Sequence, residues 1–246
     1  GYLSSNNSAR LVWVGADGGK RLIRILREDG SLLRSHAGGV TVGGEFTYRF
    51  SGRFVGLEVR GYLLSTRGEN IVRQYYDDVA SVFSDMVITD MDKLYAGVEL
   101  GCDIALTDRF ALRTAFAQAW NTYRNDPMVR IYSDKDGSVI APDARSYLRG
   151  YRLGGSPQRV AAAELSYQGV RMWRVAVSVN YVADNYVSLS PLNRMSRVFD
   201  YAASPEDLER LVTQERFPEA FTINLFAYKT FRLGRGYLTL SGSVNN

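Results

Sequence analysis

Hydrophobic and polar residues alternate along most of this chain, and helical periodicity is nearly absent. In the clearest run, Val40, Val42 and Phe46 occupy one set of alternate positions, and Thr41 and Glu45 occupy the other. This period of two is typical of a strand with one apolar and one polar face. Comparable runs lie near 55–64, 96–106, 110–120, 161–167, 173–181, 221–225 and 238–244. The sequence therefore predicts about eight strands, most of about ten residues or more.

The connections between these strands alternate in length. Short turns at 51–53, 107–109, 168–171 and 234–236 join the members of four hairpins. Long segments near 66–92, 122–159 and 183–219 join one pair to the next. Unstructured loops of that length are uncommon in compact domains, whereas outer-membrane barrels have short turns at one rim and long extracellular loops at the other. The pattern over 40–246 favours an all-β fold, an antiparallel transmembrane β-barrel built as a meander of hairpins.

Aromatic residues gather beside the short turns and predict a belt at one membrane interface. A strand of about eleven residues tilted by about 40° covers roughly 28 Å of the membrane normal, which spans the apolar band. The predicted belt contains Phe50, Phe54, Phe110, Tyr167, Trp173, Phe231 and Tyr237.

A soluble antiparallel sandwich or barrel would show the same alternation. The polar faces carry many charges, however, which suit a wide, wet lumen better than a small packed core. These charged residues include Glu45, Arg49, Glu58, Arg60, Glu99, Asp103, Arg113, Glu164 and Arg174.

Residues 1–39 are less regular, and we interpret them as an extracellular loop with a local hairpin between Leu11–Val14 and 21–25. Within 183–219, the run Ser204-Pro205-Glu206-Asp207 predicts the start of a short helix, because it combines a capping serine, an early proline and acidic residues at the positive end.

One predicted loop offers a candidate ligand site. Tyr75 and Tyr76 stand beside Asp77 and Asp78, and aromatic rings with carboxylates can bind a cation or a sugar-like ligand. A solvated loop tip would have the same composition, so both interpretations stay open.

Composition excludes several other functions. Hydrophobic residues make up 46% of the 246 residues, which fits an ordered chain. His36 and Cys102 are the only histidine and cysteine, so we expect no His- or Cys-based metal site, no cofactor and no Ser–His catalytic pair. The net charge is only +4 and the basic residues are scattered, so we expect neither an enzyme nor a nucleic-acid-binding protein.

Three stretches in order carry a family resemblance. They are 89–126, 147–197 and 217–246, and their most specific pieces are GGSPQ at 154–158, NYVADNYVSLSPLNR at 180–194 and the closing SGSVNN. Together they resemble the C-terminal barrel region of TonB-dependent outer-membrane receptors, over roughly 40–246.

The resemblance implies that these strands belong to a barrel of about 22 strands, closed by an N-terminal plug. It implies a receptor in the outer membrane of a Gram-negative bacterium that takes up a scarce ligand: an iron chelate, cobalamin or an oligosaccharide. The implied partners are outer-membrane lipid, the TonB complex acting through the plug, the transported ligand and, as in some relatives, a surface lipoprotein.

The chain starts at Gly1 without a methionine and stops at Asn246 directly after an alternating run. We therefore expect a fragment that lacks the plug and the final strands of the barrel. A self-contained small outer-membrane barrel with a structural or adhesive role is the alternative.

Overall fold

The computed structural model describes residues 11–14, 20–23, 39–77, 82–133, 138–200 and 204–246. Eight long strands form one antiparallel sheet in the order β13-β12-β11-β10-β6-β5-β4-β3. Their bounds are β3 Val40–Ser51, β4 Val55–Asp77, β5 Val82–Ala105, β6 Phe110–Ala119, β10 Pro157–Gly169, β11 Trp173–Asn185, β12 Ala220–Leu233 and β13 Gly236–Asn245. The predicted all-β antiparallel fold is confirmed.

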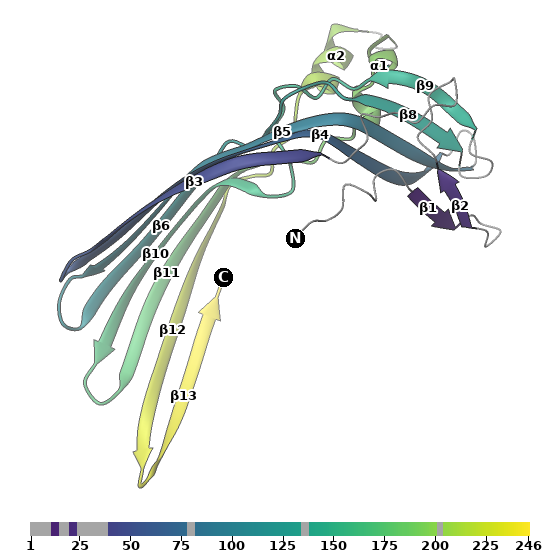
Figure 1. The fold of residues 1–246 in the computed structure, drawn as a ribbon. Helices are drawn as coiled ribbons and strands as arrows, with labels where there is room; N and C mark the ends of the chain where they lie inside the picture. Colours follow the sequence, from purple (N-terminus) through teal and green to yellow (C-terminus); the bar gives the residue numbers. More distant parts are fainter. Residues whose placement is uncertain (1–10, 15–19, 24–38, 78–81, 134–137, 201–203) are drawn as a thin grey trace.

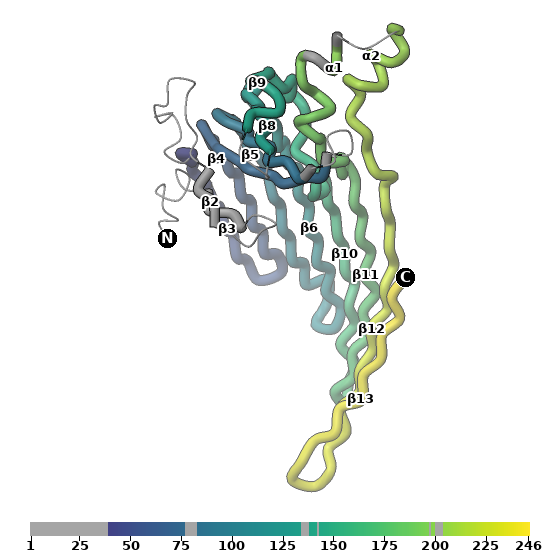
Figure 2. Tube along the Cα trace, turned by 90° about the vertical axis from the view of Figure 1, so that its right-hand side faces the viewer, coloured from purple at the N-terminus to yellow at the C-terminus, as the bar shows by residue number. Residues whose placement is uncertain are grey.

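The sheet is a curved, open surface (Figures 1 and 2). In the part of the chain that the structure describes, β3 pairs only with β4 and β13 pairs only with β12, so the eight strands do not close on themselves. The four short turns lie together at one end, and the long connections lie at the other (Figure 2). This arrangement follows from the predicted hairpins.

The segment 66–92 is not the irregular loop that its length and composition suggest. β4 and β5 run through it as a single hairpin of 23 and 24 residues, interrupted by register shifts between Thr66 and Ile71. Beyond these shifts, Met86, Val87 and Ile88 are consecutive buried residues. Because both faces of the hairpin are covered there, the apolar–polar alternation stops and the sequence no longer resembles a strand.

The long connections build a folded cap, which we define as the described parts of 66–92, 121–153 and 186–219. It contains β7 Thr122–Tyr123, β8 Met128–Ser133, β9 Val139–Arg145, η2 Leu192–Arg194, α1 Ser196–Asp200 and α2 Pro205–Val212. β8 pairs with the extended part of β5, and β9 pairs with β8. The main cluster of buried hydrophobic residues lies in this cap: Met86, Ile88, Met91, Val129, Ile131, Ala141, Leu148 and Met195.

Two glutamine side chains hold the cap in place, Gln158 by joining it to strand β10 of the sheet and Gln214 by joining two segments of the cap. The buried Gln158 side chain accepts from the backbone N–H of Asn121 at 3.1 Å and donates to the Asn121 carbonyl at 3.1 Å. Gln214 does the same with Arg152, at 2.9 and 2.8 Å. Each side-chain amide thus satisfies the backbone N–H and C=O of one residue, as a neighbouring strand would do in a sheet.

Two of the three most specific resemblance motifs meet at Gly154. A side-chain carbon at this glycine would lie 2.5 Å from both the backbone nitrogen and the Cα of Ser188. The neighbouring Gly155 donates its N–H to the carbonyl of Tyr186 at 3.3 Å. GGSPQ and NYVADNYVSLSPLNR are therefore parts of one contact, in which two backbones approach too closely for any side chain.

Helix α2 confirms the helix predicted at Ser204, whose hydroxyl accepts from the Asp207 N–H at 3.1 Å. At the other end of the helix, the Tyr151 hydroxyl donates to the Val212 carbonyl and Arg194 donates to the Thr213 carbonyl at 3.1 Å. The buried Arg194 guanidinium also lies 4.4 Å from the centre of the Tyr151 ring. A cation at a helix C-terminus complements the negative end of the helix dipole.

We expect Arg194→Met to release the end of α2. The substitution keeps most of the apolar contact but removes charged hydrogen bonds of about 1.5–3 kcal/mol each. Amide hydrogen exchange across 205–213 should accelerate, and by much more than in Arg210→Met, which removes only an exposed, solvent-screened charge from the last turn of the same helix. Equal exchange rates in both variants would contradict this role for Arg194.

The N-terminal part of the chain contains β1 Leu11–Val14 and β2 Lys20–Ile23, which pair as an antiparallel hairpin. The pairing expected between these two segments is confirmed: β2 begins one residue before the predicted 21–25, and residues 24 and 25 lie outside the described part. The other residues of 1–38 lie outside the described part. Within that part, no helix is long and apolar enough to cross a membrane.

Candidate functional site

The sheet has one continuous apolar face. Strand register places one hydrophobic residue from each of seven neighbouring strands, β4 to β13, in a single row. Several of these side chains are strongly exposed, including Leu165 at 46% and Val244 at 67%. The full row is Val55, Ile104, Leu112, Leu165, Val177, Leu225 and Val244. A patch of this extent is unusual for a face in contact with water.

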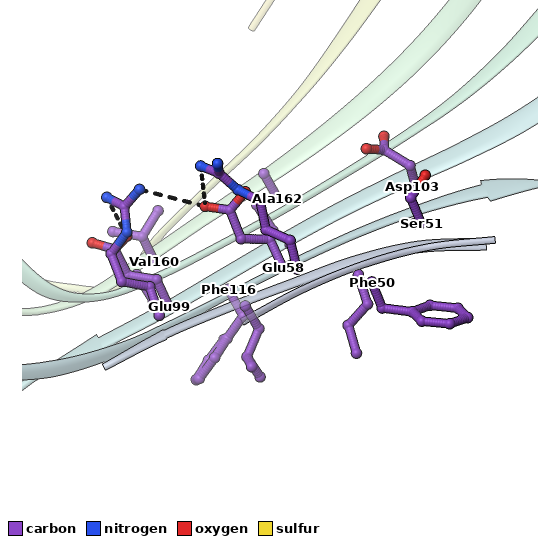
Figure 3. A pocket seen from close by; sticks show the side chains of 16 residues that line it. Phe50, Ser51, Glu58, Glu99, Asp103, Phe116, Val160 and Ala162 are labelled. Atoms are coloured by element: carbon purple, nitrogen blue, oxygen red, sulfur yellow. Dashed lines mark hydrogen bonds and ion pairs between the residues drawn. The ribbon is translucent and has the colours of Figure 1, made fainter. Parts of the chain in front are cut away.

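The opposite face carries a ladder of alternating charges. Arg49 pairs with Glu58 at 2.8 Å, and Arg60 lies between Glu58 at 3.4 Å and Glu99 at 3.6 Å. Figure 3 shows Glu58, Glu99 and Asp103 on one side of the sheet and Phe50 and Phe116 on the other. The strand period of two thus separates the sheet into a charged and an apolar surface.

The ladder continues toward β11 with two further pairs. Arg113 contacts Asp103 at 3.2 Å, and Arg174 contacts Glu164 at 2.7 Å. These side chains are partly exposed, so each pair contributes only about 0–1 kcal/mol to stability. Because each of these acidic residues has a basic partner, the described ion pairs leave the positive and negative charges on this face nearly balanced.

A shallow trough of about 510 Å³ lies along this charged face. Its hollow arises where small residues replace long ones, at Gly101, Ala115 and Ala162, which share one register across three strands. The wall of the trough is made by the Arg49, Glu58, Arg60 and Glu99 group (Figure 3). The arrangement can accept a polar partner through several hydrogen bonds.

Aromatic rings border the apolar face at the short turns. Phe110 packs on Tyr167 with ring centres 4.7 Å apart, and Tyr167 packs on Trp173 at 5.1 Å. Phe50 and Phe231 occupy the same face in β3 and β12. Phe54 lies in the first turn.

Tyr237 departs from the predicted belt. It pairs with Arg232, whereas Leu238 pairs with Phe231 and takes the apolar position. The turn at Gly234-Arg235 sets this register. Tyr237 is therefore on the charged face of the sheet, which turn position alone could not reveal.

Polar side chains border the apolar face at the cap end. Asp184 lies between Arg159 at 2.9 Å and Arg216 at 3.0 Å. Close by, Arg159 donates to Gln118 at 2.8 Å, and the Tyr181 hydroxyl donates to Glu219 at 2.6 Å. The apolar face is thus bounded by rings at one end and by a charged cluster at the other.

Of the four residues predicted as a ligand site, the structure describes the side chains of Tyr75 and Tyr76. Tyr75 packs against the buried cluster of the cap, while Tyr76 is exposed and stacks edge-to-face on Phe83, with ring centres 5.1 Å apart. Neighbours in a strand point to opposite faces, so the two tyrosines cannot share one site. Asp77 ends β4, but its side chain and all of Asp78 lie outside the described residues. Phe83 was missed because its pairing with Tyr76 depends on strand register.

The cap contains two groups with shifted titration. The Arg130 guanidinium donates two hydrogen bonds to the Asp143 carboxylate, and these raise the pKa of Arg130, which stays cationic throughout the accessible pH range. Burial raises the pKa of Tyr123 in β7. Neither group is matched to acid–base chemistry near neutral pH.

Comparison of the chain with models of known protein families, with characterised proteins and with solved structures finds no match.

Proposed function

We propose that this chain is part of an outer-membrane β-barrel whose apolar face contacts lipid and whose charged face lines the lumen. The observation that carries the proposal is the two-faced sheet: an exposed apolar surface lies opposite a ladder of ion pairs. A soluble sheet would bury its apolar face against another layer. In contact with lipid, the exposed apolar face carries no free-energy cost of contact with water.

The borders of the apolar face support the same environment. On β11, Trp173 belongs to the aromatic border, and Asp184 near the other end belongs to the charged cluster. The ten or so residues between them rise about 33 Å, or roughly 25 Å along the normal at a tilt of about 40°, which equals the height of the apolar band of outer-membrane barrels.

We further propose that the complete protein is a TonB-energised receptor that takes up a scarce ligand such as an iron chelate, cobalamin or an oligosaccharide. The resemblance of 89–126, 147–197 and 217–246 to such receptors supports this step. The cap supports it as well, because a folded structure at one mouth gives a receptor a defined surface for its ligand or a lipoprotein. The TonB complex would act through a plug encoded outside this chain.

Uptake by the intact protein tests the proposal. Cells carrying the intact gene should accumulate one radiolabelled member of a panel of ferric chelates, cobalamin and oligosaccharides. Accumulation should disappear when the gene or TonB is deleted, and each loss should be restored by complementation. The protein should fractionate with the outer membrane.

Uptake that persists without TonB would contradict an energised receptor. Recovery of the protein in the outer membrane with no uptake of any ligand would instead favour a barrel with a structural or adhesive role. Recovery in the soluble fraction would overturn the membrane assignment itself.

A further inference from the structure

Each of the four short turns contains an arginine. We name the described turn residues 52–54, 106–109, 170–172 and 234–235 the short-turn rim. Its basic residues are Arg53, Arg109, Arg171 and Arg235, and its single carboxylate is Asp108. The rim thus bears an excess of positive charge, in contrast to the balanced ladder on the charged face.

The four arginines are exposed. Within the described ranges, no ion pair joins any of their side chains to a carboxylate. Arg53 instead lies over the Phe54 ring, 5.1 Å from its centre. Unpaired guanidinium groups are well suited to bind phosphate, because their planar N–H groups match its oxygens.

The hairpin topology brings these residues to one end of the sheet. Every short turn joins two antiparallel neighbours, and all four turns follow one edge in Figure 1. Successive turns are two strands apart, a lateral separation of about 10 Å. The arginines therefore form a row directly beyond the aromatic border of the apolar face.

Lys229 provides an independent indication of what this row faces. It lies on the apolar face of β12, opposite Trp173 and two residues closer to the short turn than Ala227. Its ammonium lies 5.8 Å from the centre of the Phe231 ring. The ammonium also donates to the carbonyl of Arg171 in the rim, at 2.7 Å. A lysine that extends its charge from an apolar surface toward the adjacent turn behaves as a side chain at a lipid–water boundary.

We propose that the short-turn rim binds the phosphate headgroups of anionic phospholipids. The inference rests on the proposed membrane location, and it adds a preference for one headgroup class at one leaflet. The phosphate would accept hydrogen bonds from Arg53, Arg109, Arg171 and Arg235, while the acyl chains cover the apolar face above the aromatic border. A protein or nucleic-acid partner would not need the apolar face and the arginine row to be continuous.

Lipid binding to the intact protein tests this proposal. Native mass spectrometry in non-ionic detergent would measure the apparent Kd for phosphatidylglycerol and for phosphatidylcholine. The rim variant R53Q/R109Q/R171Q/R235Q is compared with R124Q/R145Q/R149Q/R210Q, which removes the same charge from exposed positions in the cap. Binding of phosphatidylcholine by all three proteins confirms that each apolar face is intact.

We expect the natural protein to bind phosphatidylglycerol on the order of tenfold more tightly than phosphatidylcholine, from the gain in attraction per basic residue at an anionic surface. The rim variant should lose this preference and the cap variant should keep it. A preference that survives in the rim variant, or is absent from the natural protein, overturns the inference.

Further outcomes distinguish a failure of the short-turn rim proposal from a failure of the membrane proposal on which it rests. Displacement of phosphatidylglycerol by a short DNA duplex at equal phosphate concentration would show that the rim does not select lipid, and would overturn the assignment. Failure to bind either lipid would count against the membrane proposal as well, whereas equal binding of both lipids would count against the rim alone.

Discussion

Val177→Arg should lower the stability of the sheet in a bilayer by about 2–4 kcal/mol. Val177 is 41% exposed on the apolar face, four residues beyond the aromatic border at Trp173. That places it about 10 Å along the normal, close to the middle of the apolar band. An arginine at this depth costs about 2–4 kcal/mol in outer-membrane barrels. Urea unfolding of the intact protein from phosphatidylcholine vesicles would measure the loss.

The adjacent residue provides a matched control. Ser178 belongs to the same strand but lies on the charged face, where Asn224 donates to its hydroxyl at 3.5 Å. Ser178→Arg introduces the same side chain into a wet surface and should change the unfolding free energy little. If both variants were equally stable, or if Val177→Arg improved solubility without loss of stability, the apolar face would not contact lipid.

Gly154→Val is the substitution that we expect to damage the cap most. Even the first side-chain carbon would lie 2.5 Å from backbone atoms of Ser188, and backbone cannot move aside as a flexible side chain can. Overpacking of this kind costs about 1–3 kcal/mol, and more where the obstacle is rigid. The thermal unfolding midpoint should fall, and hydrogen exchange should accelerate around Gly155 and Tyr186.

A glycine in the sheet serves as the comparison for this substitution. A side-chain carbon at Gly242, in β13, would meet nothing within 4 Å. Gly242→Val should therefore be tolerated, with a small gain from β-propensity. Equal damage from the two substitutions would mean that loss of glycine flexibility, and not the contact with Ser188, determines the effect.

The sheet itself could be predicted from sequence because one of its faces is apolar and the other charged. Such a surface forces strict alternation in each strand, and tight turns such as Ser51-Gly52-Arg53 separate the members of each pair. The start of α2 was also predictable, since Ser204 and Asp207 act within one turn of helix.

The cap could not be predicted in the same way. Ile88 and Val129 are fully buried in it, and a strand covered on both faces loses the alternation on which the prediction depends. The contacts of Gln158 and Gln214 join residues 37 and 62 positions apart. A local sequence pattern therefore cannot predict them. In sequence, GGSPQ carries only a family resemblance; its structural reason is the contact of Gly154 with Ser188.

The two tyrosines of the candidate ligand site illustrate the same limit. Tyr75 and Tyr76 were grouped because they are neighbours in sequence, but they lie in a strand, which directs them to opposite faces. The exposed aromatic pair is Tyr76 with Phe83, and it required knowledge of the β4–β5 register.

The order of the strands also has a consequence for how the sheet assembles. Each long strand pairs with the long strand before and after it in the chain, and no connection crosses another strand of the sheet. Pairing of sequence neighbours keeps the entropy of loop closure low at each step. The sheet can therefore assemble one hairpin at a time, and β13 adds to the free backbone N–H and C=O groups at the edge of β12.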